Sequence, residues 1–268
     1  MLFNASEIKG YAIAASDGNI GTVTDLLFDD AGWLVRWLVV ETGNWLSGRK
    51  VLLPTSTLGH ANASRREFSA KLTMQQVKDS PNIDTERPVS RQMETNIYGH
   101  YGWNPYWGNG LYMGAYGYSG GMGASPFLGA GPNAWRSENE AAKAQRERYD
   151  PNLRSINAVE GYHIQATDGG IGHVEDFLVE EADWSIHYLV VDTRNWWPGK
   201  KVLISPRSAK EVSWTDRSVD VNVDRQTVKN SPTYDASTAV DRDYQDHFNN
   251  YYSGVGPETG AGQRDAGS

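Results

Sequence analysis

Two aspartates occupy equivalent positions in two similar segments of this sequence and are the first candidates for catalytic residues. Asp25 and Asp176 lie 151 residues apart within similar apolar segments. General acid–base catalysis needs a second group within hydrogen-bond reach of the carboxylate, and the sequence indicates none. We therefore predict that both side chains accept hydrogen bonds from backbone N–H groups or a neighbouring turn. The acidic pairs Asp29-Asp30 and Glu180-Glu181 are interpreted as solvated hairpin turns, with weak binding of a divalent cation as the alternative.

Histidines and glycines form no recognisable metal or phosphate site. The sequence has six histidines and no cysteine, and no histidine recurs at the 151-residue offset or stands in an H-E-x-x-H pattern. A duplicated metal site would keep its ligands in both copies, so we predict no metal, no cofactor and no catalytic residue. The glycine run Gly120-Gly121-Met122-Gly123 neither follows a strand nor opens a helix, which argues against a phosphate-binding loop. The histidines are His60, His100, His163, His173, His187 and His247.

Tryptophan stands beside basic residues in one loop of each half. The first loop contains Trp45, Arg49 and Lys50, and the second repeats the pattern with two tryptophans and two lysines. A Trp ring offers rigid apolar contact area and a nearby cation adds direction, as expected of a contact surface. We predict a partner-binding surface here; the alternative is a tryptophan lid that closes one end of a barrel, with solvated basic residues. The predicted partner-binding residues are Trp45, Arg49, Lys50, Trp196, Trp197, Lys200 and Lys201.

An internal repeat determines which elements position these residues. Shifted by 151 residues, the sequence matches itself without a gap, and 29 of the 72 positions from 10 to 81 are identical. Leu38-Val39-Val40 aligns with Leu189-Val190-Val191, and the match thins but continues through Arg91 and Arg242 to Tyr101 and Tyr252. A unit of roughly 90 residues is longer than the ~20–50 residues of a solenoid repeat. The chain is therefore a duplicated domain.

Each copy is predicted to be rich in β-strands. In the first copy, apolar segments at Tyr11–Ala15, Ile20–Phe28 and Trp33–Thr42 are separated by glycine-containing turns. Lys50–Leu53 is a further strand, and the capping box Thr73-x-x-Gln76 begins a short helix. The pattern predicts a mainly β fold with two small barrels of five or six strands, each with a short C-terminal helix. The predicted domains are a first barrel at 1–94, a Gly/Tyr/Trp-rich linker at 95–135, a short charged helix at 136–150, a second barrel at 151–252 and a disordered tail at 253–268.

The middle segment differs in kind from the repeats. Residues 95–135 contain no Asp, Glu, Lys or Arg but hold 11 glycines and 10 aromatic residues. Because glycine loses the most backbone entropy on ordering, this density opposes a packed core, and we predict a flexible low-complexity linker. The alternative is an adhesive segment for a partner, a membrane interface or self-association, formed by Tyr98, Tyr101, Trp103, Tyr106 and Trp107.

Several motifs of the repeat together resemble one known family. They are Ile20-Gly21-x-Val23-x-Asp25-x-Leu27, Trp33, Leu38-Val39-Val40-Glu41, Val51-Leu52-Leu53-Pro54 and the closing helix Thr73–Pro81. In both copies the chain resembles the PRC-barrel domain, named after the photosynthetic reaction centre H subunit and found also in a ribosome maturation factor. The resemblance implies a small β-barrel that binds other macromolecules and has no catalytic apparatus. The transmembrane helix of the H subunit and the RNA-associated domain of the ribosome factor have no counterpart here, so the chain resembles the stand-alone bacterial PRC-barrel proteins.

These observations predict a non-catalytic protein-interaction or scaffold module. The alternative is a peripheral component of a membrane photosynthetic or electron-transport complex, and a ribosome-assembly factor is less favoured. A net charge of −8 disfavours general nucleic-acid binding. No segment reaches the ~20 apolar residues that span a bilayer, and no signal peptide is recognised. We expect a cytoplasmic protein, or one held peripherally at the inner membrane, whose partners are unidentified proteins, membrane-complex proteins among them; self-association is a further alternative.

Overall fold

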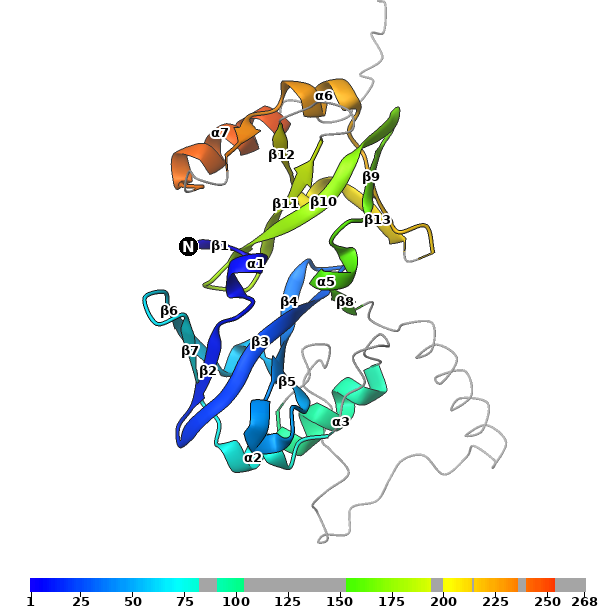
Figure 1. Ribbon diagram of the computed structural model, residues 1–268. Helices are drawn as coiled ribbons and strands as arrows, with labels where there is room; N and C mark the ends of the chain where they lie inside the picture. Colours follow the sequence, from blue (N-terminus) through cyan, green and yellow to red (C-terminus); the bar gives the residue numbers. More distant parts are fainter. Residues whose placement is uncertain (82–90, 104–152, 194–199, 214, 236–239, 254–268) are drawn as a thin grey trace, which may run out of the picture. The chain divides into compact units, whose positions relative to one another are not determined.

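The chain is mainly β and divides into two compact units (Figure 1). The computed structural model describes residues 1–81, 91–103, 153–193, 200–213, 215–235 and 240–253. One unit comprises Glu7–Asn157, and the other comprises Met1–Ser6 together with Ala158–Ser268. The division therefore follows the sequence repeat except at a short segment preceding each repeat.

The unit of the first repeat is built on a seven-stranded sheet. Its strands are β2 (Ala12–Ala15), β3 (Gly18–Asp29), β4 (Leu34–Glu41), β5 (Lys50–Pro54), β6 (Leu58–Asn62), β7 (Glu67–Ala70) and β8 (Leu153–Ser155). Its helical elements are the 3-10 turns η1 (Gly43–Leu46) and η2 (Thr55–Thr57) and the α-helices α2 (Met74–Lys78) and α3 (Arg91–Tyr101). The strand order is β5-β4-β3-β2-β7-β6, with β8 on β3, and β2 and β7 are its one parallel pair among the described residues.

The unit of the second repeat has the same plan in an eight-stranded sheet. Its strands are β1 (Leu2–Asn4), β9 (His163–Ala166), β10 (Gly169–Glu180), β11 (Ile186–Asp192), β12 (Lys201–Ile204), β13 (Ala209–Ser213), β14 (Ser218–Val221) and β15 (Thr233–Tyr234). Its helical elements are η3 (Pro206–Ser208), α6 (Arg225–Asn230) and α7 (Arg242–Ser253). Two four-residue helices, α1 (Ala5–Ile8) and α5 (Ile156–Val159), lie where the chain passes from one unit to the other.

A long, bulged strand is central to each sheet. β3 and β10 each contain 12 residues, and the pairing with the next strand shifts at Asp25 in one and at Asp176 in the other. Bulges bend a strand and increase its twist. A Cβ atom on Gly21 would lie 2.0 Å from the carbonyl oxygen of Glu41, and one on Gly172 would lie 2.0 Å from that of Asp192. Only glycine permits this close backbone approach, which explains why both copies have it.

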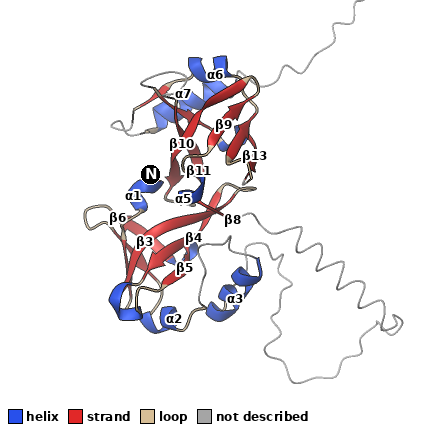
Figure 2. Cartoon of the chain, turned by 45° about the vertical axis from the view of Figure 1, so that its right-hand side comes forward, coloured by secondary structure: helices blue, strands red, loops and turns tan. Residues whose placement is uncertain are grey.

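A helix after each repeat covers one face of its sheet (Figure 2). In the first unit, α3 places Ile97 and Tyr98 against Trp37, which is fully buried on β4. In the second unit, α7 places Phe248 against Tyr188, with ring centroids 4.7 Å apart. Because these central strands are covered on both faces, their side chains are apolar nearly without interruption.

The mainly β prediction is confirmed, and the strand count needs a correction. The first repeat contributes six strands of its own, within the predicted five or six, whereas the second contributes seven, β9 to β15; one added strand in each unit raises the totals to seven and eight. The short C-terminal helices are α2 and α6; α2 has the predicted N-cap Thr73, and Asp224 takes the same place in α6. Residues 95–101, which the sequence analysis places in the linker, lie in α3 because their apolar residues pack on the sheet. The predicted helix at 136–150 lies outside the described residues.

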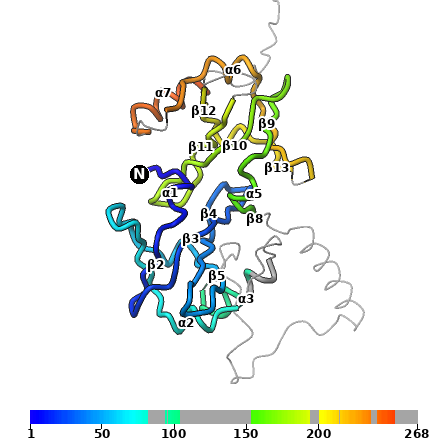
Figure 3. Tube along the Cα trace, in the orientation of Figure 1, coloured from blue at the N-terminus to red at the C-terminus, as the bar shows by residue number. Residues whose placement is uncertain are grey.

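The added strands come from an exchange between the repeats (Figure 3). β1 pairs antiparallel with β10 through Leu2–Glu180, Phe3–Val179 and Asn4–Leu178. β8 pairs with β3 through Leu153–Asp29, Arg154–Phe28 and Ser155–Leu27, which are the same positions at the 151-residue offset. Each repeat therefore receives its additional strand from the segment that precedes the other repeat, and the domain boundaries at 1–94 and 151–252 do not describe this exchange.

Candidate interaction sites

The recurring aspartates hold the exchanged segments in place. The Oδ1 atom of Asp25 accepts hydrogen bonds from the N–H groups of Leu26 at 2.8 Å and Asn157 at 3.2 Å, and the Ser155 hydroxyl donates to Oδ2 at 2.5 Å. Burial raises the pKa of Asp25 above its ordinary value, although these hydrogen bonds oppose the shift. The prediction that this carboxylate accepts backbone N–H groups is confirmed.

Asp176 has the equivalent set of contacts in the second unit. Its Oδ1 atom accepts from the N–H groups of Phe177 at 2.8 Å and Ser6 at 3.2 Å, and the Ser6 hydroxyl donates to Oδ2 at 2.5 Å. Residue 6 is the counterpart of residue 157, so the same backbone N–H is bound in both units. Both aspartates are thus positioned to fasten a strand that enters from the other repeat.

The acidic pairs at the ends of the long strands form ion pairs, which corrects the prediction that they are solvated turns. Asp30 accepts from Arg154 on β8 at 2.7 Å, and these side chains are 14 % and 6 % exposed. Asp29 pairs with Arg36 at 3.1 Å. Glu180 binds the N-terminal ammonium group. Burial raises the pKa of this carboxyl, but the ammonium group, the N–H of Ala182 and the charge of His187 together lower it, and the net shift is downward.

In the first repeat, two of the predicted partner-binding residues make contacts within the fold. The indole N–H of the half-buried Trp45 donates to the carbonyl of Ile20 at 2.6 Å. The guanidinium of Arg49 donates to the carbonyls of Lys78 at 2.9 Å and of Ser80, which ties the loop to the C-terminal end of α2. Lys50, at the start of β5, is exposed.

The second loop is described only at its C-terminal end. Trp196 and Trp197 lie outside the described residues. Lys200 is half-buried, and the ammonium group of Lys201 pairs with Glu175 at 2.7 Å. The base of the loop is held alike in both copies: Thr42 donates through its hydroxyl to the carbonyl of Arg49 at 2.8 Å, and Thr193 donates to that of Lys200 at 2.7 Å.

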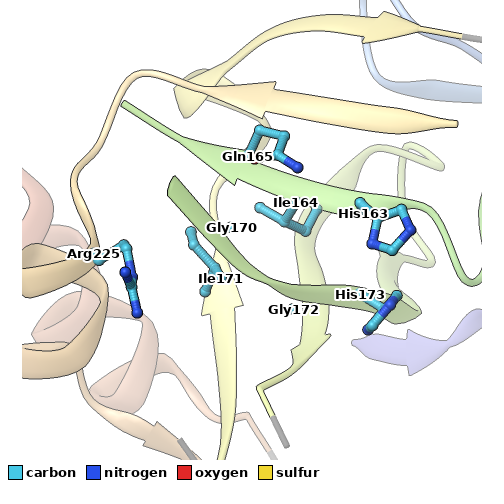
Figure 4. Close-up of a pocket in the computed structure, with 8 residues that line it drawn as sticks. All are labelled: His163, Ile164, Gln165, Gly170, Ile171, Gly172, His173 and Arg225. Atoms are coloured by element: carbon cyan, nitrogen blue, oxygen red, sulfur yellow. The ribbon is translucent and has the colours of Figure 1, made fainter. Parts of the chain in front are cut away.

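A pocket that the sequence analysis did not predict lies over the β9–β10 hairpin (Figure 4). It encloses about 270 Å³. His163 and His173 are direct cross-strand neighbours with ring centroids 4.6 Å apart, and Arg225 on α6 lines the other end. The remaining lining residues are Ile164, Gln165, Gly170, Ile171 and Gly172. The pocket brings imidazole and guanidinium nitrogen atoms to one surface, which suits an anionic side chain or ligand.

The signal that could have revealed this pocket is a departure from the repeat. The first repeat has Ala12 and Thr22 at the positions of the two histidines, and Met74 at that of Arg225. The histidines and the arginine of the pocket therefore stand at positions that differ between the copies, whereas the shared positions are mostly structural. Among the described residues, no group of three or more His, Cys, Asp or Glu side chains could hold a metal ion.

Comparison with protein families identifies the first part of the chain. Residues 1–68 match the family model of the PRC-barrel domain. The N-terminal region is a PRC-barrel domain. The match runs from β1 into β7, so the PRC-barrel sequence unit includes the strand that the structure places on β10. No curated protein matches the chain.

PRC-barrel domains are generally non-enzymatic modules, which agrees with the roles seen for the shared residues. Gly21, Asp25 and Thr42 contact backbone groups and hold strands, a bulge and the base of a loop together. No described helix is both long and apolar enough to cross a membrane.

Proposed function

We propose that the chain is a non-catalytic protein-interaction or scaffold module built from two PRC-type barrels that present different chemistry on equivalent faces. The observation that carries the proposal is the contrast between retained and divergent positions. Asp25 and Asp176 are retained and bind exchanged segments. At the β2–β3 and β9–β10 hairpins, the small side chains of Ala12 and Thr22 are replaced by two histidines. A common scaffold with a divergent surface is what two different binding tasks require.

The pocket of the second repeat suits an acidic segment of a partner protein. Arg225 is half-buried and His173 is half-buried, so both ends of the pocket carry partly desolvated nitrogen donors. Hydrogen bonds from such donors to a carboxylate are stronger and shorter than those between neutral groups. Ile164 and Ile171 also line the pocket but are fully buried, so the surface open to a partner is formed by the other lining residues, the two histidines and Arg225 among them.

The predicted loop residues belong to the same proposal. Lys50 is exposed at the end of the first loop, and Lys201 keeps 41 % of its side chain exposed beside Glu175. Trp45 uses its N–H within the fold while its ring remains half-buried, so part of the ring is left for contact. We include Arg49, Trp196, Trp197 and Lys200 as residues of these two loops, from the sequence pattern alone.

The test compares the full chain with a variant whose pocket carries the first repeat's residues. The substitutions are His163→Ala, Gln165→Ala, His173→Thr and Arg225→Met, each a residue that the first repeat has at the same place. Cross-linking in the native host, followed by mass spectrometry, is expected to lose partner peptides joined to the second repeat. A control with Lys210→Ala and Lys229→Ala, both exposed positions of the same unit, should keep them.

A separate variant with Trp45→Ala and Lys50→Ala tests the first loop. We expect it to lose cross-links at the first repeat and keep those at the pocket. If both variants fold, as measured by thermal unfolding, and both recover every partner peptide of the unaltered chain, neither surface mediates binding. Loss at one surface alone assigns the interaction to that surface.

A further inference from the structure

The edge of β10 that takes β1 is a complete docking site for a short strand. Three consecutive backbone positions are in register, from Leu2–Glu180 to Asn4–Leu178. Phe3, 6 % exposed, is buried in the unit, and Ser6 binds Asp176 through both its N–H and its hydroxyl. The N-terminal ammonium group binds Glu180. All of these donor contacts lie within residues 1–6.

The connection between the donor strand and its own repeat is short. α1 begins at Ala5, the residue after β1 ends at Asn4, and the chain changes unit between Ser6 and Glu7. The N–H of Gly10 then joins the first repeat by donating to the carbonyl of Val23 at 2.8 Å. Hinges with few spare residues favour strand exchange over folding back onto the same repeat.

The edge of β10 that accepts β1 has no feature that requires this strand to come from the same chain. The acceptor positions on β10 and on β3 are equivalent, and each is filled by a segment that belongs to the other repeat in sequence. The PRC-barrel match also begins at residue 1, so a sequence unit of this family includes the strand that is exchanged here. Within one chain, the donor strand β1 and the acceptor strand β10 belong to the same polypeptide, which raises the effective concentration of the donor at the acceptor edge.

We propose that the β10 edge with Asp176 is a self-association surface, and that its partner is residues 1–6 of a second copy of this chain. Two chains that exchange these segments bury the same contacts as two closed monomers. The equilibrium between them therefore depends on protein concentration and on the entropy of closure, not on new interface contacts. This inference stands independently of the pocket and loop proposals.

Cysteine pairs test the exchange in the full chain, which has no native cysteine. One chain carries Leu2→Cys and another carries Glu180→Cys, the two positions being cross-strand neighbours on β1 and β10. The two variants are unfolded together, refolded at increasing concentration and oxidised with diamide, which forms the disulfide at the expense of the reagent. In the control mixture, Glu180→Cys is replaced by Asp29→Cys, the equivalent position of the first repeat, which β8 covers.

We expect a covalent heterodimer from the Leu2→Cys and Glu180→Cys mixture, with a yield that rises about in proportion to concentration. The control mixture should give at least tenfold less. Asn4→Cys with Leu178→Cys repeats the test at a second register pair, in case the loss of Glu180 affects folding. No heterodimer from either pair at any concentration that stays soluble, or equal yields from the control, overturns the proposal.

Discussion

Arg154→Ala is expected to destabilise the first repeat, although residue 154 precedes the second repeat in the sequence. Arg154 lies on β8, which pairs with β3, and its Nε–H donates to Asp30 at 2.7 Å. Both side chains are largely buried, with exposed fractions of 6 % and 14 %. Removing the arginine leaves the Asp30 carboxylate buried without this cation.

The expected loss of stability is about 3 kcal/mol. Breaking a buried ion pair by removing one partner typically costs about 3–5 kcal/mol, and the lower end applies because Asp30 keeps some contact with water. Burial raises the pKa of Asp30, and Arg154 opposes this shift. The stability lost in the variant should therefore be smaller at low pH, where the Asp30 carboxyl is protonated and carries no charge. In the unit of the second repeat, Phe3 on β1 stands at the place of Arg154. The double variant Arg154→Phe with Asp30→Leu should recover most of the loss, because an apolar pair replaces the charges.

Hydrogen exchange followed by mass spectrometry locates the effect, and urea unfolding measures its size. We expect faster exchange in β3 and β4 and unchanged exchange in β10 and β11. Arg207→Ala, at an exposed position of the second unit, is the control and should cost less than 0.5 kcal/mol. Faster exchange in β10 and β11, or a cost equal to that of the control, would refute the strand exchange as the basis of this stability.

Four further substitutions have expected effects whose direction follows from the structure. Gly21→Ala should cost about 2 kcal/mol or more in thermal unfolding, because its Cβ would meet the carbonyl oxygen of Glu41 at 2.0 Å, whereas Gly99→Ala, in open space on α3, should stabilise by about 0.5–1 kcal/mol. Trp37→Phe should cost about 2 kcal/mol, because the buried Glu94 loses an indole N–H donor at 2.7 Å; a neutral result would show that this hydrogen bond is replaced. Asp25→Asn should remove a pH-dependent contribution to the free energy of unfolding. Because the pKa of Asp25 is raised, the folded state binds this proton more tightly than the unfolded state, so the carboxyl adds stability below about pH 4 and this stability is lost as the pH rises through the folded pKa. Urea unfolding of both proteins should show that the difference in stability between them shrinks as the pH rises.

Features encoded by neighbouring residues were predictable from the sequence. The capping box of Thr73 and Gln76 is present at the start of α2, as predicted. The turn at Asp17 and Gly18 connects β2 to β3, and the side chain of Asp17 also accepts from the N–H of Met74. Such signals are local, because each partner lies within a few residues or recurs at the repeat offset.

Features that depend on distant partners were not predictable in the same way. Leu2 and Leu153 are equivalent in the repeat, and so are their possible acceptors, Asp29 and Glu180. Because both donors and both acceptors occupy equivalent positions of the repeat, the pattern of apolar residues does not state which of β3 and β10 takes which donor. Asp30 was interpreted as solvated for the same reason: its partner Arg154 is 124 residues away. In α3, the glycine-rich composition obscured Ile97 and Tyr98, whose burial against Trp37 decides the helix.

The exchange explains why some positions of the two repeats stayed alike while others diverged. A strand from one repeat must fit the acceptor of the other, and Asp25 and Asp176 bind the incoming segment through the backbone N–H of Asn157 and of Ser6, so the aspartate is retained although the donor residue differs. The hydroxyl that meets the carboxylate nevertheless comes from residue 155 in one unit and residue 6 in the other, two positions apart after allowing for the offset. What is constrained is therefore the set of contacts, not each residue that supplies them. Side chains such as His163 lie on β9, away from the acceptor positions at 178–180, and were free to acquire different chemistry.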